Sequence, residues 1–307
     1  MDPLQVYPIP NTSNLQPINH LRFRVDQLQP GILNDSNCCC LLSLLLCLHR
    51  LSLVNFFIDP SQMMRNGAPD FTIMTLMKIL KALPSTQAFS INSFITSWNR
   101  DGRGIQLGQN EDLYIVEGIL KQLSLRHRGP GPVLTLFKAS YFCPQCQVQY
   151  RGITEWLNQR FELIPELRLP DQQQQVNPAD LITELMNERF QVICQVCQHQ
   201  INDASFDIQK GKFTILTLNR AVIRNRRMAK IMTPISSGVS NCRGSQFIGE
   251  LVAVVCHRTQ PHLHWVSYTK ADNRWFRNDD HNPPVPAAPF NSGNPDETIN
   301  MLCYINN

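Results

Sequence analysis

The chain has 307 residues, of which 43% are hydrophobic and 17% charged, so a sizeable core can form and wholesale disorder is excluded. Its formal net charge of +4 is too small for the dense positive field of a dedicated nucleic-acid-binding protein. The longest nearly apolar run, residues 38–48, is shorter than the roughly 18 to 20 residues of a membrane span. No basic segment followed by an apolar one opens the chain, so no targeting signal is predicted and a cytoplasmic or nuclear location is expected.

The amino-terminal part of the chain is predicted to be extended and then helical. Residues 1–30 hold five prolines among Asn and Gln, which is typical of an extended arm, and ordered structure is expected to begin near Gly31. Apolar side chains then recur at helical spacing over residues 73–83, where Asp70 is the candidate N-cap, and over about 111–123. Both apolar faces are expected to belong to a core.

After residue 133 the sequence changes to short β-branched and aromatic runs separated by turn residues, which predict strands. One helix is expected among them, with Asn177 as its N-cap and Pro178 in its first position. The Gln-rich residues 171–175 and the Pro-rich residues 282–295 are predicted to be surface loops. A helical part followed by antiparallel strands is an α+β arrangement. The predicted strands cover residues 133–139, 161–169, 189–194, 212–218, 250–257, 263–269 and 299–305.

Two CxxC pairs among the 11 cysteines predict a structural zinc site. Cys143 pairs with Cys146 and Cys194 with Cys197, and 47 residues separate the pairs. Each pair can form a knuckle at the tip of a long hairpin, and two knuckles give the closed set of four thiolates that structural zinc prefers. Buried thiols or a redox pair are the alternatives, but the repeated motif favours zinc. A closed set leaves no position for water, so this metal is not expected to do chemistry.

Polar turn residues stand directly before an apolar helix in residues 31–48, with Cys38, Cys39 and Cys40 at its start. The positive end of a helix dipole and the unpaired amides there favour a thiolate and stabilise a nearby oxyanion. A cysteine in this place without catalytic partners would be an ordinary buried thiol, because free cysteines are among the most buried residues. The nucleophile hypothesis therefore depends on residues elsewhere in the chain.

The expected partners lie in a predicted hairpin near the carboxyl end. His264 stands in the strand 262–268, a turn at 270–273 follows, and the returning strand 274–280 ends in Asp279 and Asp280. Pairing of the two strands would bring His264 beside Asp279. A thiolate, an imidazole that deprotonates it and a carboxylate that orients the imidazole form the cysteine version of a catalytic triad.

These motifs resemble the catalytic domain of ubiquitin-specific proteases, which are deubiquitinases with a papain-like fold. Residues 31–48 are similar to the Cys box of that family, and residues 263–268 and 275–280 to its His box. The resemblance implies an α+β fold with a helical thumb at about 31–140, zinc-bearing β fingers at about 141–211 and an antiparallel β palm at about 212–307. These parts would follow the arm at 1–30. The matching Cys-box residues are Gly31, Asn34, Asn37, Cys39, Ser43, Leu45 and Leu48.

The resemblance also implies a role for each catalytic residue. Cys39 would be the nucleophile, Asn34 the side-chain donor of the oxyanion hole and His264 the general base. Asp279 takes the position of the third triad member and Asp280 that of an adjacent acidic residue that assists in some relatives. Either carboxylate could orient His264.

Three further residues are expected to bind substrate. Glu111 and Asp112 resemble acidic positions of the family that hold the basic tail of ubiquitin, although acids at a helix start are also typical of a solvated face. Trp265, next to the general base, is the third. Leu263 replaces the glycine that precedes the family's histidine, and a side chain there could narrow the channel for the substrate tail.

The function that the resemblance implies is thiol-dependent hydrolysis of isopeptide or peptide bonds after the C-terminal glycine of ubiquitin. The expected partners are ubiquitin or ubiquitinated proteins, and the expected cofactor is structural Zn²⁺. No membrane or nucleic-acid partner is expected. The alternatives are a protease for another ubiquitin-like modifier such as SUMO, and a catalytically weak scaffold that binds ubiquitin. The scaffold would be indicated by loss of Cys39, His264 or Asp279, and all three are present.

Overall fold

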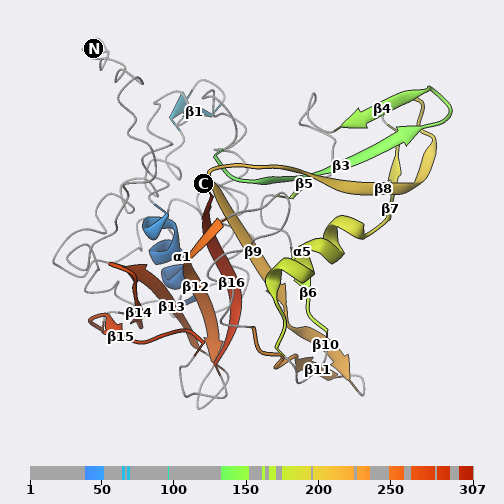
Figure 1. The fold of residues 1–307 in the computed structure, drawn as a ribbon. Helices are drawn as coiled ribbons and strands as arrows, with labels where there is room; N and C mark the ends of the chain where they lie inside the picture. Colours follow the sequence, from blue (N-terminus) through green and yellow to red (C-terminus); the bar gives the residue numbers. More distant parts are fainter. Residues whose placement is uncertain are drawn as a thin grey trace, which may run out of the picture.

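The described part of the chain forms two β-sheets and two helices (Figure 1). The predicted arm at 1–30 and the predicted helices at 73–83 and 111–123 lie outside it. Two short antiparallel pairs, β1 (Met64–Arg65) with β2 (Ala68–Pro69) and β10 (Ala221–Arg224) with β11 (Arg227–Lys230), form separate two-stranded sheets. The computed structural model describes residues 39–51, 64–65, 68–69, 96, 133–151, 161–162, 166–170, 175–194, 196–224, 227–235, 249–258, 264–280, 282–290 and 297–306.

The large sheet has seven strands in the order β15-β14-β13-β12-β16-β9-β6, and every neighbouring pair is antiparallel except β6 with β9. Its central strand β12 is buried without interruption from Leu251 to His257. A continuous buried run means that both faces of the strand are covered. The strands are β6 (Glu166–Arg168), β9 (Phe213–Asn219), β12 (Gly249–Arg258), β13 (His264–Ala271), β14 (Arg274–Asn278), β15 (Val285–Pro286) and β16 (Glu297–Asn306).

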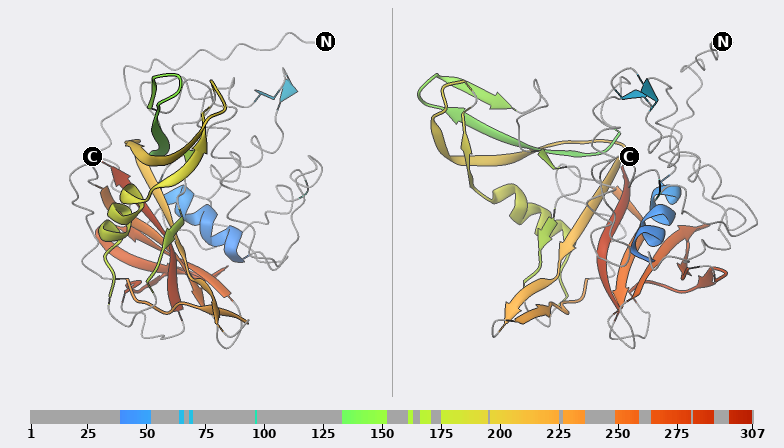
Figure 2. Two further views of the ribbon diagram at one scale, coloured as in Figure 1. Left: turned by 90° about the vertical axis from the view of Figure 1, so that its right-hand side faces the viewer. Right: turned by 180° about the vertical axis from the view of Figure 1, so that it is seen from behind.

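Helix α1 (Cys39–Arg50) covers part of this sheet and packs against β12 and β13 (Figure 2). All of its residues from Cys39 to Leu48 are buried, as expected for a helix that is apolar all round. Polar contacts fix its carboxyl-terminal part, where Cys47 Sγ lies 3.7 Å from the Val254 carbonyl and Arg50 donates to the Lys270 carbonyl. The helix is therefore held rigidly on the sheet, which also fixes the position of Cys39 at its first turn.

The small sheet projects away from the large one on the side opposite α1 (Figure 2). Its strand order is β4-β3-β8-β7, and β5 also pairs with β3. Each CxxC pair lies at the turn of a hairpin, Cys143 and Cys146 between β3 and β4, and Cys194 and Cys197 between β7 and β8. The strands are β3 (Leu136–Cys143), β4 (Val148–Arg151), β5 (Phe161–Glu162), β7 (Phe190–Ile193) and β8 (Gln200–Gln209).

A buried cluster of hydrogen bonds joins the two sheets. The side-chain amide of Asn306 donates to the Gly211 carbonyl at 2.8 Å, to Thr214 Oγ1 at 2.8 Å and to Thr135 Oγ1 at 3.1 Å. Thr135 also accepts from the backbone N–H of Gly211 at 3.0 Å. A side chain on Gly211 would meet the backbone of Leu134 at 2.2 Å, so the close approach at this junction requires a glycine.

Helix α5 (Pro178–Asn187) begins where the sequence predicts. The Asn177 side chain accepts a hydrogen bond from the Ala179 N–H at 2.9 Å, and Pro178 occupies the first turn, so the N-cap prediction is confirmed. Leu181 and Ile182 enter the core of the large sheet. None of the helices in the described residues is long and apolar enough to cross a membrane.

Two sequence predictions are wrong in detail. The predicted strand at 161–169 is two strands that belong to different sheets, because β5 pairs with β3 whereas β6 pairs with β9. Pro165 lies between them and lacks the N–H that a continuous ladder needs. The predicted loop at 282–295 is partly a strand, since β15 pairs with β14 and Phe290 packs against the core. Its prolines suit this edge position.

Candidate active site and metal site

Three elements bring Cys39, His264 and Asp279 together. Cys39 is the first residue of α1, His264 is the first of β13, and Asp279 directly follows β14. The β13–β14 hairpin closes through Asp272 and Asn273, which have φ values of 46° and 60°, as a tight two-residue turn requires. The register set by this turn brings the start of β13 beside the residue after β14, as the predicted hairpin requires.

His264 is the centre of the cluster. Its Nε2 atom lies 2.6 Å from Asp279 Oδ1, and an interaction with the Cys39 thiol raises the pKa of the imidazole. Because Asp279 occupies Nε2, Nδ1 is the nitrogen that remains for the sulfur. The side chains of His264 and Asp279 are 17% and 23% exposed, so the cluster is sheltered and still open at its rim. A thiol, an imidazole and a carboxylate in this order can transfer a proton from sulfur to nitrogen.

The charges of the cluster stabilise one another. The hydrogen bond to Asp279, followed by the one to Cys39, raises the pKa of His264 to about 10, against the opposing effect of burial. The hydrogen bond from His264, with help from the Arg277 charge, lowers the pKa of Asp279 to about 2 despite burial. At neutral pH the site therefore holds an imidazolium between a carboxylate and the sulfur of Cys39.

These shifts predict how the cluster contributes to stability as pH changes. Because the pKa of His264 is raised in the folded protein, protonation of this residue stabilises the fold. The contribution is complete below pH 6.5, the ordinary pKa of histidine, and is lost as pH rises towards about 10. Because the pKa of Asp279 is lowered, its ionised form also stabilises the fold. This contribution is complete above pH 3.8, the ordinary pKa of aspartate, and is lost as pH falls towards about 2. Urea unfolding should therefore show the largest difference between wild type and His264→Gln between about pH 4 and 6.5. A difference that stays constant from there to pH 10 would contradict this assignment.

The structure distinguishes the two carboxylates that the sequence left open. Asp279 hydrogen-bonds His264, whereas Asp280 raises the pKa of His264 through its charge. One side-chain atom from each of these three residues lies within 4.8 Å of the others. Asp280 has a φ of 49°, and the N–H of Asn282 donates to the Asp279 carbonyl at 3.0 Å. This tight turn holds both carboxylates beside the imidazole.

Trp265 does not offer the open surface expected of a substrate-binding residue. It is only 7% exposed and stacks on His257, with ring centroids 4.5 Å apart. The two residues are cross-strand partners on β12 and β13, so the indole packs within the sheet that carries His264. Burial and the nearby Lys230 charge lower the pKa of His257 to about 4. The expected contact of Trp265 with substrate stays a prediction.

Three other predicted site residues, Asn34, Glu111 and Asp112, lie outside the described residues, as does Leu263. One neighbour of the cluster was missed by the sequence reasoning. The Arg277 guanidinium donates to Asp279 Oδ2 at 2.7 Å. The sequence could have indicated this contact, because side chains alternate along a strand and Arg277 and Asp279, two residues apart, are expected on the same face.

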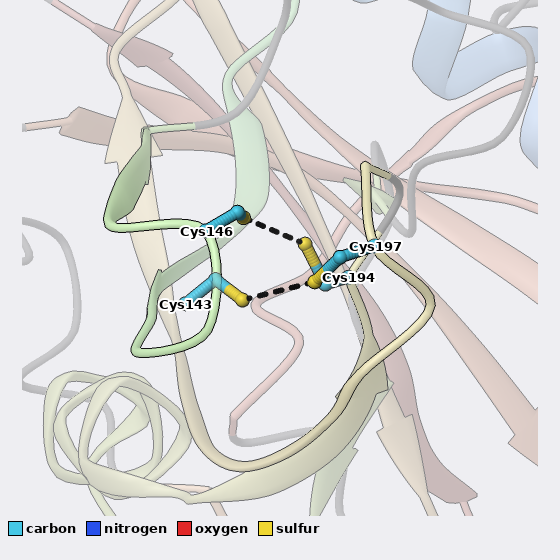
Figure 3. A group of neighbouring side chains, drawn as sticks. All are labelled: Cys143, Cys146, Cys194 and Cys197. Atoms are coloured by element: carbon cyan, nitrogen blue, oxygen red, sulfur yellow. Dashed lines mark hydrogen bonds between the residues drawn. The ribbon is translucent and has the colours of Figure 1, made fainter.

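The four predicted zinc ligands converge between the two hairpin turns (Figure 3). Cys143 Sγ lies 3.5 Å from Cys197 Sγ, Cys146 Sγ lies 3.6 Å from Cys194 Sγ, and all four sulfurs are within 4.8 Å of one another. Tetrahedral zinc with bonds of about 2.3 Å would separate its sulfurs by about 3.8 Å. The donor set and its spacing therefore fit a metal ion of this kind.

The size of the surrounding core supports a metal at this position. The thiols share one negative charge without it: backbone N–H groups of Cys197 and Val196 lower the pKa of Cys194 to about 6, whereas burial and the neighbouring thiols raise the pKa of Cys146 to about 12. Besides the cysteines, the buried cluster around the two knuckles consists of Tyr141, Ile201 and Ala204. So few apolar side chains bury little surface, and small units of this kind usually need a metal or disulfides.

Comparisons with known proteins support the fold and leave the activity open. The sequence matches no protein-family model, and no curated protein matches it. The structure resembles a chain of the SAGA DUB (deubiquitinase) module Ubp8/Sgf11/Sus1/Sgf73 bound to monoubiquitin, with a TM-score of 0.57 and 17% identity. The match covers 92% of this chain and 70% of that chain. At this identity the likeness shows a shared fold, in agreement with the sheet-rich α+β fold that the sequence predicts.

Proposed function

We propose that this protein is a cysteine-type deubiquitinase that hydrolyses isopeptide or peptide bonds after the C-terminal glycine of ubiquitin. The observation that carries the proposal is that His264 hydrogen-bonds Asp279 and interacts with the thiol of Cys39, which lies at the first turn of a buried helix. A single histidine on a strand is usually structural, but a histidine with a thiol on one nitrogen and a carboxylate on the other has the geometry of nucleophilic catalysis.

In the first half of the proposed reaction, the Cys39 thiolate attacks the carbonyl carbon of the terminal glycine. The N–H groups at the start of α1 stabilise the oxyanion, and Asn34 would supply a side-chain donor there. The protonated His264 then gives its proton to the leaving amine, and the C–N bond breaks to leave a thioester on Cys39. The raised pKa of His264 keeps this proton in place at neutral pH.

In the second half, water resolves the thioester. The neutral His264 left by the first half takes a proton from the water, whose oxygen attacks the same carbonyl carbon. The C–S bond breaks, the carboxyl group of ubiquitin leaves and gives its proton to solvent, and the thiolate facing the imidazolium is restored. Asp279 keeps the same ring orientation through both halves because its hydrogen bond to Nε2 does not change.

Ubiquitin is proposed as the modifier because the matching module was solved with monoubiquitin bound. The proposed substrate contacts are Glu111 and Asp112, whose carboxylates would pair with the basic tail of ubiquitin. We also propose the division into thumb (about 31–140), fingers (about 141–211) and palm (about 212–307). The large sheet with α1 and the projecting small sheet support this division.

The proposed cofactor is one structural zinc ion held by Cys143, Cys146, Cys194 and Cys197. Four thiolates fill its coordination sphere, so the metal would stabilise the two knuckles without taking part in the reaction. The residues that do the chemistry lie on α1, β13 and the turn after β14, whereas the cysteines lie at the turns of the projecting sheet.

Ubiquitin and SUMO probes with a C-terminal electrophile test this function directly. We expect intact-mass analysis to show one ubiquitin adduct on the wild type and on Cys38→Ala, and none on Cys39→Ala. Cys38→Ala is the matched control because it removes the neighbouring thiol. A SUMO adduct alone would keep the mechanism and overturn the substrate. No adduct on folded, zinc-loaded protein would refute the enzyme proposal, and an adduct that survives Cys39→Ala would refute the choice of nucleophile.

A further inference from the structure

The hydrogen bonds of the candidate triad continue beyond Asp279. Asp279 has two carboxylate oxygens, and His264 occupies only Oδ1. Arg277 donates to the other oxygen, Oδ2, at 2.7 Å through Nη1. The second terminal nitrogen of the same guanidinium, Nη2, lies 3.6 Å from Glu297 Oε2. One arginine therefore bridges the carboxylate of the candidate triad and a second carboxylate on another strand.

Glu297 is a fixed anchor for this arginine. Its side chain is only 3% exposed, and its Oε1 accepts a hydrogen bond from the hydroxyl of the fully buried Tyr268. Tyr268 is the direct cross-strand partner of Arg277 on β13 and β14, and Glu297 opens β16. Residues of three strands, β13, β14 and β16, thus fix the position of the guanidinium. A buried carboxylate requires such partners because an unpaired buried charge is costly.

Asp279 needs a second support because of its place in the fold. It directly follows β14, at the rim of the sheet, where the backbone pairing between β13 and β14 has ended. A carboxylate bound at one oxygen can still turn about its side-chain bonds. A guanidinium presents its donors in a rigid planar fork, so contact with Asp279 and Glu297 together fixes the direction of Oδ1 towards His264.

We propose that Arg277, anchored by Glu297, is a positioning residue that holds Asp279 in line with His264 and so supports the reactivity of Cys39. This inference rests on the proposed function of the site. The competing explanation is purely structural, with Arg277 serving only to neutralise the buried Glu297. The two explanations differ in whether replacing Arg277 changes the reactivity of Cys39 through a change in the position of Asp279.

Steady-state cleavage of a fluorogenic ubiquitin C-terminal amide gives the first test. Arg277→Met should lower kcat by about 10- to 100-fold, as loss of residues that orient a catalytic group often does, and change KM by less than about threefold. Arg277→Lys should recover part of kcat, because it keeps one donor for Asp279 but cannot span both carboxylates. Arg274→Met is the matched control, since Arg274 lies on the same strand with its side chain exposed, and it should leave both constants unchanged.

A double-mutant cycle on Cys39 labelling gives the second test, and it does not depend on ubiquitin. The rate of chloroacetamide alkylation at Cys39, followed by peptide mass spectrometry, should fall in Arg277→Met. The same substitution should change that rate by less than about twofold when Asp279→Ala is already present. Glu297→Gln keeps an acceptor for Tyr268 and removes the charge that faces Arg277, so it should cause a smaller loss than Arg277→Met.

The outcomes separate this inference from the proposed function. Equal losses with and without Asp279→Ala would overturn the positioning role, as would unchanged labelling in Arg277→Met. A lower melting temperature with unchanged Cys39 labelling would favour the structural explanation. If ubiquitin substrates are not cleaved at all, the function fails, but the labelling cycle still decides whether Arg277 acts through Asp279.

Discussion

Replacing His264 with Ala is expected to reduce kcat/KM for a ubiquitin substrate by about 10⁴-fold or more. His264 hydrogen-bonds Asp279 and interacts with the Cys39 thiol, so its loss removes the proton acceptor and the later proton donor together. The fold should survive because the histidine lies at the rim, at the first position of β13. Progress curves with a fluorogenic ubiquitin amide, together with circular dichroism, would measure both effects.

The two neighbouring carboxylates provide the comparison for this prediction. Asp279→Ala should cost much more activity than Asp280→Ala, because Asp279 makes the hydrogen bond that orients the imidazole whereas Asp280 contributes through its charge. The reverse ranking would mean that the working site reorganises around Asp280. Activity of His264→Ala within tenfold of wild type would remove His264 from the mechanism altogether.

Local patterns made several features predictable from the sequence. The helix at Asn177 and Pro178 begins as expected because the residues that form its N-cap are adjacent in the sequence. His264 and Asp279 flank one hairpin, so strand pairing alone brings them together. Cys39 is different, because it lies more than 200 residues earlier and no spacing rule connects it with His264. Its place in the site followed from the family resemblance.

Other features depend on contacts that no local pattern contains. Glu297 meets Arg277 only because β16 and β14 belong to the same sheet, and neither neighbouring sequence indicates the pairing. Trp265 packs within the sheet because the residue opposite it on β12 is His257, whose ring stacks on the indole. Residues 161–169 form two strands in different sheets, which alternation of apolar residues cannot indicate. In each case tertiary packing decided the outcome.

Replacing Cys194 with Ser is the second substitution for which we expect a large effect. Cys194 is fully buried beside Cys143, Cys146 and Cys197, and a serine hydroxyl does not replace a zinc-bound thiolate. Structural zinc contributes about 10 to 16 kcal/mol in small zinc peptides, comparable with the ~5 to 15 kcal/mol that stabilises a whole domain. Elemental analysis of the purified protein should show one zinc per wild-type chain and a large loss in the variant.

The unfolding caused by this loss should begin in the small sheet and not in the large one. Around the knuckles the buried cluster besides the cysteines is only Tyr141, Ile201 and Ala204, whereas the large sheet has an extensive core. Hydrogen exchange should therefore accelerate first over β3, β7 and β8. Val196→Ser is the matched control, because Val196 lies in the same knuckle, is 62% exposed and contributes no thiolate, and it should keep its zinc. Full zinc content and unchanged exchange in Cys194→Ser would show that these cysteines are ordinary thiols, and the metal site would have to be abandoned.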